Sequence, residues 1–199
     1  GTGKIAGLIA IMVWMSSGLH AQEKNDAIKA FNTSIELMKT NNDSAILSFE
    51  ECIKICEQVG DSAFEIQYKA EQVLPGLYLQ KASNLLTVDK KTEEALAVAK
   101  KTLQVAEKYD NPKVAENARR IMIQSYSNMA SAFVDKKENE KAIQAYDSLL
   151  MINPEQVSAL YNKALIYRGM DNGLKFEEAI DVYIAKVKTT GDTVKTEQA

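Results

Sequence analysis

Apolar residues recur every three or four positions along most of the chain, which is the spacing of an amphipathic α-helix. From Asn25 onward the first stripe of this kind comprises Ala27, Phe31, Ile35 and Met38. Turn residues 40–43 interrupt it, and a second stripe then runs from Ala45 to Cys56. Asp43 is expected to cap the second helix and Gly60 to end it, because a carboxylate accepts free backbone N–H groups and glycine tolerates a left-handed backbone. Two such helices joined by a short turn predict an antiparallel hairpin.

The same unit recurs along the rest of the chain, where turn residues separate further helical stripes. The expected helices are 63–88, 92–109, 112–134, 140–152, 156–170 and 175–187. In the first of these, Pro75 and Gly76 are expected to kink or split the helix, since proline lacks an N–H and clashes with the preceding turn. The pattern therefore predicts four helix pairs in succession.

One segment, 123–156, carries the residue spacing of a complete 34-residue repeat. Its large and small residues are Tyr126, Met129, Ala130, Phe133, Ala142, Tyr146 and Pro154. This pattern resembles the tetratricopeptide repeat, in which W-x2-L-G-x2-Y is followed by A-x3-F and then by P. The alanines allow the two helices of a pair to approach closely, and the aromatic residues fill the space beside them.

The resemblance extends over roughly residues 25–188, although the other units match less closely. The fourth unit offers Leu160, Ala164, Tyr167, Ala179 and Tyr183. In that alignment its turn is three residues longer than in the third unit, and Lys163 stands where a large apolar residue is usual. The alanines expected to begin the second helices are Ala45, Ala95, Ala142 and Ala179, at spacings of 50, 47 and 37 residues.

The resemblance implies an all-α fold, an α-solenoid of about four antiparallel helix pairs, whose first helices line the concave groove of a superhelix. It also implies a scaffold or adaptor that binds a peptide or a partner protein in that groove. The side chains expected to face the groove are Gln80, Asn84, Thr87, Gln124, Ser127, Ser131, Ser158, Tyr161, Leu165 and Arg168. Tyr161 is the strongest candidate for a contact, because tyrosine gives large area at modest entropy cost.

Two other interpretations of these groove residues remain. They could form a solvated helix surface without a ligand, or a pocket for a small ligand or a glycan. The latter should show clustered aromatic residues, whereas this groove offers Tyr161 alone. Some tetratricopeptide proteins grip a C-terminal carboxylate with Lys and Asn side chains, but here Ser127 and Ser131 occupy such places and Asn162 alone matches, which argues against a clamp of that kind.

Composition argues against chemistry and against nucleic acid. The formal net charge is −3, without the basic face that nucleic acid usually needs. The single histidine, His20, falls in the N-terminal segment. Cys52 and Cys56 are four residues apart on one helix face, and the sequence offers no further ligands with which they could hold a metal. We therefore expect both cysteines to be buried and to act as small hydrophobic residues. We therefore expect a protein without catalytic residues, bound metal or cofactor.

The N-terminal segment has the layout of a secretory signal. Lys4 precedes the uncharged apolar run 5–15, and small or polar residues lead to Ala21, where cleavage is expected. The expected organisation is a signal peptide over residues 1–21, a repeat domain over 22–188 and a polar tail over 189–199, in a protein exported to the periplasm or cell envelope. A retained membrane anchor and a buried helix are the alternatives for the segment. Because the tail lacks a capping helix, the fourth pair is expected to be exposed, or to be covered by a partner or by further chain.

Overall fold

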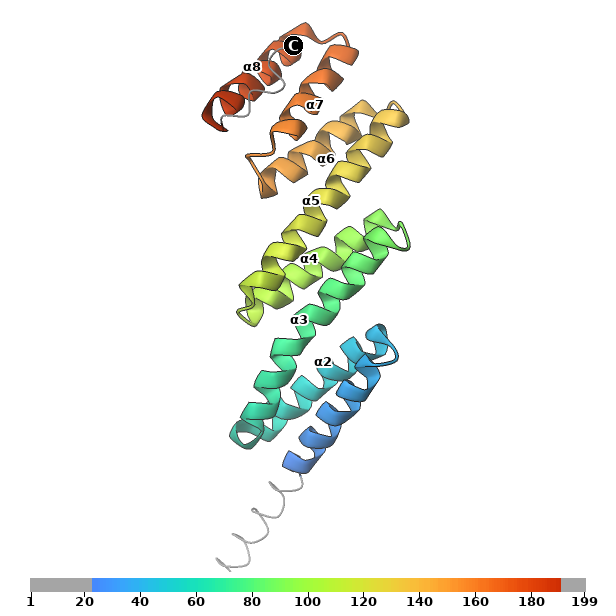
Figure 1. The fold of residues 1–199 in the computed structure, drawn as a ribbon, viewed down its shortest axis with the longest axis vertical. Helices are drawn as coiled ribbons and strands as arrows, with labels where there is room; N and C mark the ends of the chain where they lie inside the picture. The colour runs from blue at the N-terminus through green and yellow to red at the C-terminus, as the bar shows by residue number, and fades with distance from the viewer. Residues whose placement is uncertain (1–22, 191–199) are drawn as a thin grey trace, which may run out of the picture. The chain divides into compact units, whose positions relative to one another are not determined.

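The computed structural model describes residues 23–190, and within them every regular element is a helix (Figure 1). After a first helix over 23–38 come α2 (Asn42–Val59), a short 3-10 turn η1 (Gly60–Ala63), α3 (Phe64–Thr87), α4 (Thr92–Lys108), α5 (Pro112–Asp135), α6 (Asn139–Ile152), α7 (Val157–Gly169) and α8 (Gly173–Thr190). The predicted all-α solenoid fold of four successive helix pairs is confirmed. The proposed signal peptide and all but the first two residues of the predicted polar tail lie outside the described residues.

The chain divides into two compact units. One comprises the described part of Gly1–Lys81 together with Thr102–Ala115, and the other Ala82–Lys101 together with the described part of Glu116–Ala199. In the first unit, Phe49 and Ile53 of α2 belong to one buried cluster with Leu74 and Leu77 of α3. In the second unit, the cluster around Tyr146 of α6 joins the third helix pair to α7. Each unit therefore contains a hydrophobic core of its own.

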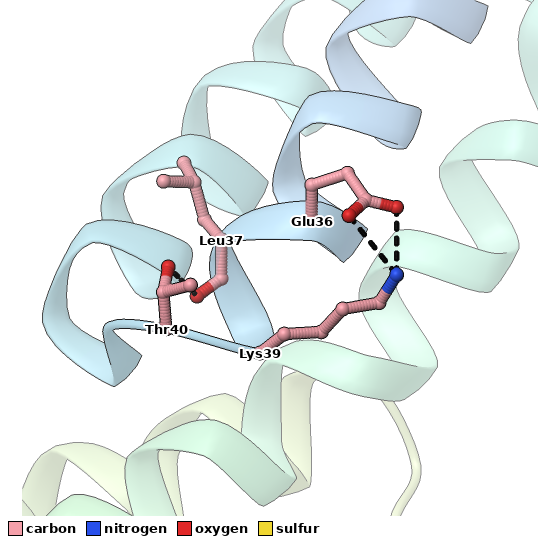
Figure 2. A network of polar contacts seen from close by, with 4 residues as sticks. All are labelled: Glu36, Leu37, Lys39 and Thr40. Carbon is pink, nitrogen blue, oxygen red and sulfur yellow. Dashed lines mark hydrogen bonds and ion pairs between the residues drawn. The ribbon is translucent and has the colours of Figure 1, made fainter.

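The helices end in turns that share one geometry. Lys90, Asp110, Lys137 and Asp171 adopt positive φ angles of 50–60°. After the last two of these, the Glu138 and Asn172 N–H groups reach back to the carbonyl oxygens of Phe133 and Tyr167, at 2.9 and 3.1 Å. These bonds satisfy carbonyl groups that a helix end would otherwise leave unpaired. In the turn after helix 23–38, the Thr40 and Asn41 N–H groups donate to the Leu37 carbonyl oxygen at 3.1 and 2.8 Å. Side chains add to this turn, since Thr40 Oγ1 donates to the same carbonyl and Lys39 Nζ donates to both Glu36 carboxylate oxygens (Figure 2).

The expected N-cap of α2 was wrong. Asn41, not Asp43, caps α2, because the Asn41 side chain accepts the Ser44 N–H at 2.9 Å while Asp43 pairs with Lys81 at 2.9 Å. The helix containing Pro75 is not split, since α3 runs from Phe64 to Thr87 with this proline buried inside it. Gly60 ends α2 with a φ of 77°, as expected.

The register of the fourth pair also differs from the expectation. Its turn, residues 170–172, is as long as the turn 136–138 of the third pair. The Ala45, Ala95, Ala142 and Phe176 N–H groups donate to the carbonyl group of the residue that precedes α2, α4, α6 and α8 respectively. Phe176 therefore takes the place expected for Ala179, and the two last pairs are 34 residues apart rather than 37. The sequence alignment had matched Ala179 to Ala142, which required a turn three residues too long.

Two small hollows show the same 34-residue register. One, of about 330 Å³, lies between α5 and α6, and the other, of about 240 Å³, between α7 and α8. The first is lined by Tyr126, Met129, Phe133, Lys141, Gln144, Ala145 and Ser148, and the second by Leu160, Lys163, Tyr167, Lys175, Glu178, Ala179 and Val182. Each residue of the second set follows its counterpart by 34 positions. The third and fourth pairs are therefore two copies of one structural repeat.

Candidate partner-binding groove

A larger hollow in the second unit lies between the end of α5 and α7. Its volume is about 650 Å³, which falls in the range of protein ligand sites. It is lined by Ser131, Val134, Asp135, Lys137, Asn139, Tyr146, Asn162, Leu165, Ile166 and Gly169. Because α5 and α7 are the first helices of successive pairs, this hollow lies on the helices that were expected to line the groove.

The floor of the hollow is fixed by a contact between α6 and α7. Tyr146 is 4% exposed and Ile166 is 7% exposed, so both are anchored in the core. Asn162 Nδ2 donates to the Tyr146 hydroxyl oxygen at 3.2 Å. This bond orients the amide, so the Asn162 carbonyl oxygen can accept a further hydrogen bond.

The walls combine apolar and hydrogen-bonding side chains. Val134 is 40% exposed and half-buried Leu165 lies on α7. Asp135 and Lys137 bring opposite charges to the rim, and the structure gives neither an ion pair within residues 23–190. The hollow can therefore hold an apolar group of a ligand, while its edge offers hydrogen bonds and charges of both signs to polar groups beside that apolar group.

Two of the predicted groove residues, Ser131 and Leu165, line this hollow. Tyr161 does not line it, because its ring packs on buried Tyr183 of α8 with the centroids 5.1 Å apart. Arg168 lies with its guanidinium carbon 5.9 Å from the ring centroid of Phe176. Tyr161 and Arg168 therefore already have aromatic contacts within their own helix pair.

The other predicted residues lie outside the hollow. Gln124 is exposed and donates to Asn128 Oδ1 at 2.8 Å, within α5. Ser158 is half-buried and its hydroxyl accepts from Gln156 at 3.1 Å. The remaining four are Gln80, Asn84 and Thr87, which are exposed on α3, and half-buried Ser127 on α5. Their role in binding stays a prediction.

Sequence reasoning missed the residues of the hollow that lie at the end of α5, in the following turn and at the start of α6. It followed the exposed faces of the first helices and stopped before their ends, so Val134, Asp135, Lys137 and Asn139 were not considered. The signal was present in the order of the elements, because a hairpin turn brings the end of one helix beside the start of the next. Asn162 was considered for a carboxylate clamp and not for a hollow.

Lys163 stands where a large apolar residue is usual, and it contacts the preceding helix pair. Its ammonium lies 2.5 Å from Asp147 Oδ1 of α6 and 6.0 Å from the ring centroid of Tyr167. A lysine stem can cover apolar surface while its charged end reaches a partner. Lys163 therefore connects α7 to α6 through an ion pair.

The described residues show few features of a chemical site. Within 23–190, no group of three or more His, Cys, Asp or Glu side chains is arranged to hold a metal ion. Cys52 and Cys56 are both free and fully buried, and burial raises the pKa of the Cys52 thiol to about 12. A thiol with a raised pKa is a poor nucleophile near neutral pH. None of the described helices is long and apolar enough to cross a membrane.

No protein-family model matches the chain, and no curated protein matches it either. Solved structures do match. The structure of MamA is 16% identical, with 78% of this chain and 94% of MamA covered, at a TM-score of 0.36. A tetratricopeptide repeat protein from Parabacteroides merdae is 22% identical, with 87% of this chain and 56% of that protein covered, at a TM-score of 0.32. YrrB, described as a TPR protein with an unusual peptide-binding site, is 17% identical, with 85% and 91% covered, at a TM-score of 0.31.

The third and fourth pairs repeat every 34 residues, as the turns and the two small hollows show, and 34 residues is the length of a tetratricopeptide repeat.

Proposed function

We propose that this protein is a non-catalytic interaction scaffold that binds a segment of another protein across the ends of α5 and α7. The observation that carries the proposal is the hollow of about 650 Å³ between these helices, with Leu165 on its wall and Asn162 held toward it by Tyr146. An apolar side chain of the partner would occupy the hollow, and its backbone would bond to the amide groups of Asn162 and Asn139. Partner recognition of this kind combines one buried anchor with a few fixed hydrogen bonds.

A small-ligand or glycan carrier is the second candidate, and the lining of the hollow favours it less. Sugar-binding pockets need exposed aromatic faces on which rings can stack. Tyr146 is the aromatic residue among those lining the hollow, and it is 4% exposed. YrrB, one of the similar solved structures, is described as having an unusual peptide-binding site, and this also supports a peptide or protein partner.

The test is photocrosslinking in living cells, with a photoreactive amino acid at Leu165 and, as the control, at Met151, which is 86% exposed on α6. We expect a defined protein to be crosslinked from position 165 and not from position 151, and the adduct to weaken when Asn162 is replaced by alanine. Recovery of a glycan or lipid alone from position 165 would support the carrier instead. Equal adducts from both positions would refute a specific groove.

We also propose that the protein is exported and acts in the periplasm or cell envelope, with cleavage after Ala21. The basis is the charge, apolar run and small residues of residues 1–21. Mass spectrometry of the intact protein from cells tests it: the expected mature chain starts at Gln22. A chain that keeps the apolar run 5–15 and fractionates with the cytosol would refute export.

A further inference from the structure

The hydrogen bond at the floor of the candidate groove leaves one donor unused. Asn162 Nδ2 donates to the Tyr146 hydroxyl oxygen at 3.2 Å, so the hydroxyl hydrogen takes no part in this bond. A phenol hydroxyl can donate one hydrogen bond as well as accept, yet among residues 23–190 the Tyr146 hydroxyl makes this one bond alone. Both residues line the hollow of about 650 Å³, and Tyr146 is 4% exposed. An O–H donor without an acceptor therefore lies at the floor of the hollow.

Helix packing does not require this hydroxyl. The residues that follow Ala142 and its counterparts by four positions are Phe49 in α2, Ala99 in α4, Tyr146 in α6 and Ile180 in α8. Three of these four are apolar, and Phe49 is fully buried, so a ring without a hydroxyl packs at this position. A buried donor without a partner costs stability. The occupant of the hollow is therefore the expected source of an acceptor for the Tyr146 hydroxyl.

The floor and the walls together define the group that fits the hollow. Val134, Leu165 and Ile166 give it apolar walls. At the floor, the Tyr146 O–H offers a donor and the neighbouring Asn162 carbonyl oxygen offers an acceptor. The matching group has an apolar body and ends in an atom that both accepts and donates. A hydroxyl group does both, whereas a carbonyl oxygen only accepts and an indole N–H only donates.

We propose that the side chain which the partner inserts into this hollow is a tyrosine. Its ring lies between the apolar walls, and its hydroxyl accepts from the Tyr146 O–H and donates to the Asn162 carbonyl oxygen. A leucine or phenylalanine side chain would fill the same space but leave the Tyr146 donor unpaired, and serine or threonine would bring the hydroxyl without the apolar body. The inference rests on the proposed function, because it names the anchor of the same partner segment.

The test uses two fragments, p-cresol as the free side chain of tyrosine and toluene as that of phenylalanine. Each is titrated into the full chain with labelled Ile, Leu and Val methyl groups, and binding is followed by NMR. We expect p-cresol to shift the signals of Leu165 and Val134 saturably. Tyr146→Phe should lower the preference for p-cresol over toluene about fivefold, the net worth of one neutral hydrogen bond. The different hydration of the two fragments cancels when the preferences of the two chains are compared.

Tyr126→Phe is the matched control. Tyr126 lies in the same unit but lines the smaller hollow between α5 and α6, so the loss of its hydroxyl should leave the preference for p-cresol unchanged. A preference that falls equally in Tyr126→Phe and Tyr146→Phe would show that the effect does not come from the floor of the larger hollow, and would overturn the proposal.

Two further outcomes would overturn the tyrosine anchor. The first is an equal preference in the unmodified chain and in Tyr146→Phe, with both fragments shifting Leu165, which would identify the anchor as purely apolar and leave the scaffold function standing. The second is the absence of shifts at Leu165 and Val134 with either fragment. The scaffold function is decided separately, by whether position 165 crosslinks a protein or a glycan in cells.

Discussion

Ala142 and Phe176 occupy the same position in successive helix pairs, and each donates its backbone N–H to the cap carbonyl four residues earlier, Glu138 at 3.1 Å and Asn172 at 2.9 Å. Their side chains nevertheless differ by a whole phenyl ring. Ala142 is fully buried, while Phe176 is half-buried and stacks against Arg168. One backbone position thus serves close helix packing in the third pair and an open surface in the fourth.

Exchanging the residue types at these two positions predicts losses of stability of different size. Ala142→Phe should destabilise the fold by about 3 kcal/mol or more, because an added ring has no room between α5, α6 and α7. Phe176→Ala should cost about 1 kcal/mol, since a half-buried ring loses only part of its burial energy. Urea unfolding measures both changes. A larger loss for Phe176→Ala than for Ala142→Phe would show that the fourth pair is packed on both sides.

The buried hydroxyl of Ser125 predicts a stabilising substitution. Ser125 is fully buried and its Oγ has no hydrogen-bond partner within the described residues, whereas the residue 34 positions later is Ala159. Ser125→Ala should therefore raise the free energy of unfolding by about 1 kcal/mol, because an unsatisfied buried hydroxyl is costly.

Ser34 provides the matched control for Ser125. It is equally buried, but its Oγ donates to the Ala30 carbonyl at 2.9 Å and lies 2.8 Å from Ser48 Oγ. Ser34→Ala should lower the free energy of unfolding by about 1 kcal/mol. If the two variants change stability in the same direction, the hydrogen-bond assignment of Ser125 is wrong.

The left-handed turn after α5 predicts stabilisation by glycine. Lys137 has a φ of 60°, which costs a side chain conformational energy that glycine avoids. Lys137→Gly should raise the free energy of unfolding by about 0.5–1 kcal/mol. Lys136→Gly, next to it but without a positive φ, should be neutral or destabilising. Thermal unfolding of the two variants side by side measures the difference.

The two thiols should be unreactive in the folded protein. Burial raises the pKa of both Cys52 and Cys56 above the ordinary thiol value, so the thiolate fraction at pH 8 is lower than in a free thiol. A chromogenic disulfide reagent at pH 8 should label neither thiol in the native chain and both in denaturant. Rapid labelling of the native chain would show that α2 opens locally or that the helix over 23–38 does not cover Cys52.

The sequence predicted the helices and their pairing because apolar spacing and turn residues are local signals. Ala130 and Tyr146 fall in the core as the repeat pattern requires. The register of the fourth pair was missed because Ala179 and Tyr183 match the A-x3-F part of the repeat pattern but lie three residues beyond the true position. Backbone hydrogen bonds at Asn172 decide the register, and these cannot be read from residue size.

The candidate site was predicted only in part, for a different physical reason. Ser131 and Leu165 lie on the exposed side of their helices, where periodicity places them. The hollow also depends on the turn after α5 and on the contact between Asn162 and Tyr146, which join residues 16 positions apart. Periodicity does not reveal that Tyr183 of α8 lies against the ring of Tyr161, and the contact expected at Tyr161 stays a prediction.

The central claim is that the hollow between α5 and α7 holds a segment of a partner protein, and calorimetric titration of that segment tests it most directly. The segment recovered by crosslinking at position 165 is titrated into the unmodified chain, Leu165→Asp and Met151→Asp. The account predicts that Leu165→Asp weakens binding at least tenfold, because it places a charge in the apolar wall, and that Met151→Asp leaves binding unchanged. Equal affinity of all three chains would contradict it.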